Sequence, residues 1–105
     1  MMREEYRLRR DLVCASLNHY PGIRAIRPDG GMFVMVDVRP TGLSAQHFAE
    51  RLLEDYGVSV LAGEAFGPSA AGHIRIGLVV DRAKLADACR RISLCAMDLL
   101  EVRRA

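Results

Sequence analysis

The chain has 105 residues, of which 50% are hydrophobic and 27% charged, a composition typical of one packed domain over residues 1–105. The formal net charge of +2 is not the strong basic excess of a nucleic-acid-binding protein, so we predict no nucleic-acid partner. No apolar run approaches the roughly 20 residues that span a bilayer. Together with the charged residues 1–10, this predicts a cytoplasmic protein that does not contact a membrane.

The first part of the chain has the pattern of a helix followed by two strands. Apolar residues recur with a helical period over residues 1–18, and the helix ends before Pro21 and Gly22. A short strand is predicted over 23–27. After a glycine-containing turn, a nearly continuous apolar run over 32–38 predicts a second strand, buried on both faces at the centre of a sheet.

A second helix is predicted over residues 45–56. These residues carry the apolar stripe of an amphipathic helix. Ser44 is a favourable N-cap because its hydroxyl can accept a hydrogen bond from a backbone N–H of the first turn. Gly57 can adopt the left-handed conformation with which helices commonly end.

The last part of the chain predicts two more strands, over 58–61 and 74–80, separated by a glycine-rich loop over 62–72. Asp81 is placed to cap a long final helix. The order αββαββα predicts an α+β fold, in which a small mixed or antiparallel sheet of three to four strands is covered by helices. A ferredoxin-like split arrangement is the competing topology, since its sequence pattern overlaps with this one.

The cysteines and histidines of the chain do not have the spacing of a metal site. There is no CxxC pair and no HxxH or HExxH motif. The three cysteines are therefore predicted to be small core residues rather than disulfide or zinc partners, and they are Cys14, Cys89 and Cys95.

Arg75 lies within the apolar run 73–80, between Ile74 and Ile76. A guanidinium is charged at any ordinary pH and is rarely buried without a partner, so this position favours binding of a carboxylate or phosphate. Alternation along a strand can also place a single arginine on the solvent face, where it needs no ligand. The residues by themselves leave both interpretations open.

Four segments of the chain carry a resemblance to a known family. In order and spacing, residues 21–22, 28–33, 57–67 and 73–77 resemble the C-terminal small domain of the class I/II pyridoxal-phosphate-dependent aminotransferases. The resemblance covers essentially the whole chain. It implies that the chain is one small domain of an enzyme whose large, cofactor-binding domain is not part of this sequence.

The resemblance implies a role for Arg75, because the arginine at the matching position in this family binds the α-carboxylate of the amino-acid substrate. It also places other residues near the mouth of the active site, as possible pocket walls: Gly31, Phe33, Gly63 and Phe66. For Gly31, together with Gly30, a purely conformational role in a tight turn is the alternative, and for Phe33 the alternative is a position in the core. Ala62 departs from the family, which usually has proline there.

The cofactor lysine of the family has no match in this chain. Lys84 is the only lysine, and helical spacing predicts that it faces solvent. We therefore expect no catalytic residue, no bound pyridoxal 5'-phosphate and no activity in this chain alone. The intact enzyme, as a homodimer, is expected to bind pyridoxal 5'-phosphate and to exchange an amino group between amino acids and 2-oxo acids. A non-catalytic ligand-binding or oligomerisation module is the alternative function.

Overall fold

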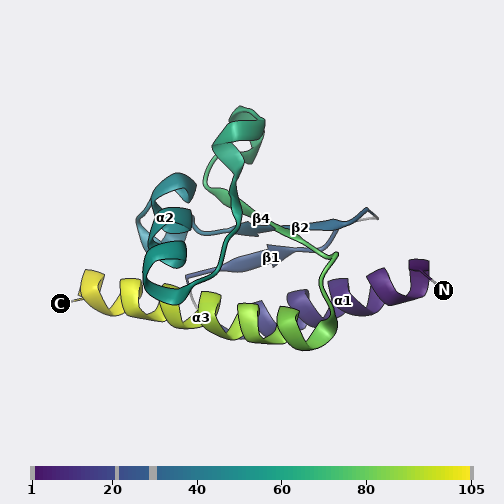
Figure 1. The fold of residues 1–105 in the computed structure, drawn as a ribbon. Coiled ribbons are helices and arrows are strands. Elements are labelled where there is room, and N and C mark those ends of the chain that lie inside the picture. The colour runs from purple at the N-terminus through teal and green to yellow at the C-terminus, as the bar shows by residue number, and fades with distance from the viewer. Residues whose placement is uncertain (1, 21, 29–30, 105) are drawn as a thin grey trace.

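The computed structural model describes residues 2–20, 22–28 and 31–104 of the chain. Its helices and strands follow the predicted order αββαββα, and the fold is α+β (Figure 1). The elements are α1 (Met2–Leu17), β1 (Arg24–Ile26), β2 (Phe33–Asp37), η1 (Arg39–Thr41), α2 (Ala45–Tyr56), β3 (Leu61–Ala62), η2 (Gly63–Phe66), η3 (Pro68–Ala70), β4 (His73–Gly77) and α3 (Arg82–Arg104), where η marks a short 3-10 helix.

The strands form one antiparallel sheet with the order β1-β2-β4-β3. In the register of the sheet, Arg75 on β4 lies between Met35 on β2 and Leu61 on β3. Phe33, the first residue of β2, lies opposite Gly77, the last residue of β4. The two long strands, β2 and β4, are therefore central, and Arg75 is in the middle of the sheet.

Helices cover only one face of this sheet. In Figure 1, α1 and α3 run side by side beneath the strands, and α2 packs beside them against α3 and β3. On β2, Val34, Val36 and the following Val38 are buried in the core below, whereas Phe33 is 41% exposed. The prediction that residues 32–38 are buried on both faces is wrong, because no α-helix of the described chain covers the upper face of this strand.

The ends of α2 and the start of α3 agree with the predicted capping residues. The Ser44 hydroxyl accepts a hydrogen bond of 3.1 Å from the backbone N–H of His47, and Gly57 has a φ of +70°. The Asp81 carboxylate accepts a 2.9 Å bond from the backbone N–H of Lys84. No helix in the described part of the chain is both long and apolar enough to cross a membrane.

The last two strands are shorter than the sequence pattern indicates. The predicted strand 58–61 is reduced to Leu61–Ala62, and the predicted strand 74–80 ends at Gly77. Gly77 is opposite Phe33, where β2 begins, so β4 loses its regular partner at this point. The apolar sequence pattern of a strand continues beyond Gly77, for example at Val79, which is 65% exposed, but these residues have no paired strand beside them.

The cysteines are core residues, as predicted. Cys14, Cys89 and Cys95 are free and buried. Burial raises the pKa of Cys89 to about 12 and that of Cys95 to about 11, so both thiols are held in their neutral form. In the described residues, no cluster of histidine, cysteine or carboxylate side chains is placed to hold a metal ion.

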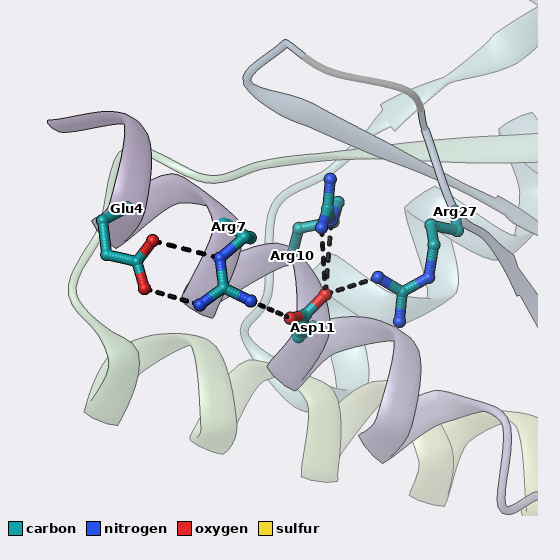
Figure 2. A network of polar contacts seen from close by, with 5 residues as sticks. All are labelled: Glu4, Arg7, Arg10, Asp11 and Arg27. Carbon is teal, nitrogen blue, oxygen red and sulfur yellow. Dashed lines mark hydrogen bonds and ion pairs between the residues drawn. The ribbon is translucent and has the colours of Figure 1, made fainter.

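Many arginines of the described chain form ion pairs on the surface. Figure 2 shows Asp11 on α1 between three arginines, of which Arg27, just after β1, is 2.5 Å away and Arg10 is 3.3 Å away. The hydrogen bond from Arg27 is the main reason that the pKa of Asp11 is lowered. Arg7 pairs with Glu4 at 2.5 Å on the preceding turn. Arg27 thus connects α1 to the segment after β1, whereas Arg7 and Arg10 pair with residues of α1 itself.

Candidate functional site

Arg75 is the only arginine on the two central strands, and its side chain extends over the open face of the sheet. Strand alternation gives Ile74 and Ile76 to the core, where they are 0% and 5% exposed, and gives Arg75 to the opposite face. The arginine is half-buried rather than fully exposed. The structure thus places Arg75 on the open face of the sheet, and its binding of a carboxylate or phosphate stays a prediction.

Two phenylalanine rings contact the Arg75 guanidinium. Its central carbon, Cζ, is 3.6 Å from the ring centroid of Phe33 and 4.4 Å from that of Phe66. Phe33 is the first residue of β2 and Phe66 is the last residue of η2, so the two rings contact the arginine from different segments of the chain. Both distances are within the range of a favourable cation–π interaction.

No carboxylate in the described part of the chain pairs with Arg75. Asp37 instead accepts a 2.9 Å hydrogen bond from the Arg39 side chain, and this bond is the main reason that the pKa of Asp37 is lowered. Glu64 accepts from two backbone N–H groups on other segments. The Nε atom of Arg75 is buried without a hydrogen-bond partner. The positive charge is therefore uncompensated and available to an anion.

Gly31 and Gly63 both have conformational reasons to be glycine. Gly31 has a φ of +88° in the turn before β2, a backbone conformation that other residues rarely adopt. A Cβ on Gly63 would overlap the carbonyl oxygen of Ala70 and lie 2.6 Å from that of His73. Gly63 thus allows η2 to pack closely on the segment before β4. Of the predicted site residues, the structure brings Arg75, Phe33 and Phe66 together, while the two glycines shape the segments that carry the rings.

Glu64 has a role that reasoning from the sequence missed. One carboxylate oxygen accepts from the backbone N–H of Gln46 at 2.8 Å, and the other accepts from that of Gly72 at 2.7 Å. The bond to Gly72 is the main reason that the pKa of Glu64 is lowered. The available signal was the first turn of α2, which has no acidic residue of its own to satisfy its free N–H groups.

Comparison with known proteins shows the family. The family model described as aminotransferase class I and II matches residues 1–92. The chain belongs to the class I and II aminotransferase family. It is 72% identical to the arginine–pyruvate transaminase of Pseudomonas aeruginosa over 99 residues, which are 94% of this chain and 25% of that protein. The sequence by itself is loosely similar to bacterial arginine–pyruvate transaminases, particularly over residues 60–73.

Solved aminotransferase structures share the fold. The crystal structure of an aromatic aminotransferase from Pyrococcus horikoshii OT3 has a TM-score of 0.85 at 34% identity, covering 99% of this chain and 27% of that one. A Thermus thermophilus aspartate aminotransferase solved with maleate has a TM-score of 0.78 at 38% identity, covering 89% and 23%. The chain thus spans about a quarter of the length of these aminotransferases.

The described residues of this aminotransferase chain do not fit a pyridoxal-phosphate site. The side chain of Lys84 is exposed in the first turn of α3, the helix that covers the closed face of the sheet. Its backbone N–H bonds to Asp81 as part of the helix cap. A lysine that reacts with a cofactor needs a desolvated amine, and this position does not provide one.

Proposed function

We propose that this chain is the C-terminal small domain of an amino-acid:2-oxo-acid aminotransferase, in which Arg75 binds the α-carboxylate of the substrate. The observation that supports the proposal is the uncompensated guanidinium on the open face of the sheet. It is held by two aromatic rings and is not paired with any carboxylate of the described residues. A relative solved with maleate, a dicarboxylate, is consistent with this role for an arginine.

The chemistry of Arg75 in this proposal is recognition, not proton transfer. A guanidinium does not lose its proton at ordinary pH, and its planar fork can donate two parallel hydrogen bonds to one carboxylate. Such a contact fixes the orientation of an amino acid as well as its position. Holding the reacting carbon at a defined place relative to catalytic groups can lower the barrier of the reaction substantially.

The cofactor, pyridoxal 5'-phosphate, belongs in our proposal to the part of the intact enzyme outside this chain. The described residues lack a suitable lysine, so the chain contributes the substrate arginine but not the cofactor site. It follows that this chain alone is inactive. In the intact protein, the amino acid and the 2-oxo acid would bind between Arg75 and the cofactor-binding domain.

The open face of the sheet is the surface that we expect the rest of the enzyme to cover. Several apolar side chains on this face are about half exposed, as is typical of a surface that another domain or subunit covers: Ile26, Phe33, Leu61 and Phe66. A second subunit or the large domain would bury them. A homodimeric enzyme is part of the proposal.

A chimeric enzyme tests the proposed function. This chain replaces the matched segment in the Pseudomonas arginine–pyruvate transaminase, and amino transfer from arginine to pyruvate is measured. We expect an active chimera that loses much of its kcat/KM on Arg75→Lys, because a point charge does not reproduce two parallel hydrogen bonds.

The matched control is Arg90→Ala, since Arg90 is an exposed arginine that pairs with Asp87 on α3. It should leave kcat/KM unchanged. A folded, active chimera in which Arg75→Lys behaves like Arg90→Ala would show that Arg75 does not bind substrate. A chimera that folds but is inactive with arginine and other amino acids would contradict the domain assignment.

A further inference from the structure

The two rings at Arg75 restrict a side chain that would otherwise be flexible. A flexible arginine loses rotamer entropy when a ligand fixes it. Contacts of 3.6 and 4.4 Å from Cζ to the centroids of Phe33 and Phe66 fix the guanidinium before any ligand arrives. Preorganisation of this kind improves binding because less freedom is lost in the complex.

The position of Phe33 is determined by the register of the sheet. Its cross-strand partner is Gly77, which has no side chain, and Arg75 is the diagonal neighbour on the same face. A Cβ built on Gly77 would have no atom within 4 Å, so the Phe33 ring does not lie over its direct partner. The ring leans toward the arginine instead.

The position of Phe66 is determined by the contacts of the first two residues of η2. Gly63 is packed against the backbone of Ala70 and His73, as described above. Glu64 bonds both to the start of α2 and to Gly72, just before β4. The segment that carries Phe66 is therefore attached to the same strand that carries Arg75, and ring and guanidinium are held at a defined distance.

The two rings also determine which atoms of Arg75 face outward. Of the Arg75 nitrogens, only Nε is buried without a partner. The two terminal nitrogens make no hydrogen bond with the described residues and are not buried, so they remain accessible to solvent. A carboxylate that approaches the open face meets the terminal pair of N–H donors. Bidentate binding through this pair needs no movement of the rings.

We infer that Phe33 and Phe66 are positioning residues, which hold the Arg75 fork with its terminal nitrogens toward the substrate carboxylate. This inference rests on the proposed function of Arg75. It differs from a pocket-wall role, in which the rings touch the substrate side chain. A positioning role affects every substrate alike, since all of them carry the same carboxylate, whereas a wall discriminates among side chains.

The kinetic test uses Phe33→Leu and Phe66→Leu in the active chimera, with arginine and alanine as amino donors. Each substitution should raise KM about fivefold, by the same factor for both donors, with kcat unchanged. Phe33→Tyr and Phe66→Tyr keep an aromatic face and should restore KM to within about twofold. The control is Leu53→Ala, which trims an apolar residue on α2 that is 55% exposed and should change neither constant.

Two kinetic results would overturn the inference. The first is a change in the ratio of the two KM values, which would assign the rings to the side-chain pocket. The second is leucine variants with unaltered KM. If a leucine variant does not fold, the tyrosine variants still test the inference. A folded tyrosine variant with a clearly raised KM would also contradict an aromatic positioning role.

A second measurement separates this inference from the proposed function. Hydrogen exchange of the Arg75 Nε–H is followed by NMR in the 105-residue chain. Because Nε is buried where the two rings contact the guanidinium, Phe33→Leu or Phe66→Leu should accelerate exchange at least about tenfold relative to Leu53→Ala. Unchanged exchange would refute the positioning role, whereas protected exchange together with an Arg75→Lys chimera of full activity would refute only the substrate role.

Discussion

The two faces of the sheet are built by the same strands but are completed in different ways. Ile74 and Ile76 point into a core that α1, α2 and α3 close within this chain. Arg75, between them, points to a face on which phenylalanine rings and a loop surround the charge but do not neutralise it. The closed face thus supplies folding stability, and the open face is left for contacts that the chain does not make with itself.

Because the two faces differ in this way, substitutions of neighbouring residues on β4 should affect different properties of the protein. Ile74→Ala should lower the free energy of unfolding by about 2–5 kcal/mol, because it leaves a cavity among side chains with no access to solvent. Ile74 is fully buried among the apolar side chains of the core. Urea unfolding of the 105-residue chain measures the loss. A change below about 1 kcal/mol would mean that the core tolerates the deletion and that the closed face does not determine stability.

Arg75→Ala should show the opposite behaviour. In the chimera we expect a loss of about 2–4 kcal/mol in transition-state binding, measured as kcat/KM, because a desolvated charged contact to the substrate is removed. The free energy of unfolding should change by no more than about 1 kcal/mol, since only the contacts with two half-exposed rings are lost. Comparable losses in both assays would mean that Arg75 is part of the structural framework.

The attachment of the Phe66 segment should depend on pH through Glu64. The pKa of Glu64 in the folded chain is below its ordinary value of 4.5, so its two hydrogen bonds stabilise the fold at pH values above 4.5. This contribution is lost as the pH falls through the lowered pKa. We expect the Gly72 N–H to exchange faster, relative to a core amide such as that of Ile76, below pH 4.5 than at pH 6.

The control for this pH effect is Glu64→Gln, which keeps the length of the side chain but cannot titrate. The variant should show faster exchange at Gly72 already at pH 6, and the additional acceleration at low pH should disappear. If the variant retained the acceleration at low pH, another titrating group would have to be responsible.

The smallest expected effect concerns Lys84 and the cofactor. Mixing the chain with pyridoxal phosphate, followed by borohydride reduction and mass spectrometry, should show no stoichiometric adduct on Lys84, because its side chain is solvated on the helix of the closed face. Lys84→Ala should give the same result. A stoichiometric adduct that Lys84→Ala abolishes would mean that this lysine is desolvated and that a cofactor can bind to the chain itself.

Local features of the chain could be predicted because they depend on residues close together in the sequence. Ser44, Gly57 and Asp81 cap helices through bonds that span at most one turn, so their residue types indicate the helix ends directly. The strand around Arg75 could be identified for the same reason, and so could the candidate arginine. The order of elements was sufficient for an α+β fold.

Only the tertiary structure decided which faces are closed and what surrounds Arg75. An apolar run such as 32–38 does not reveal whether helices cover one side of a strand or both, because that depends on where α1 and α3 pack. Phe33 and Phe66 are 33 residues apart in the chain. The register of β2 with β4 and the hydrogen bonds of Glu64 bring both rings to one guanidinium. Contacts of this kind are set by packing between distant segments, and no local pattern contains them.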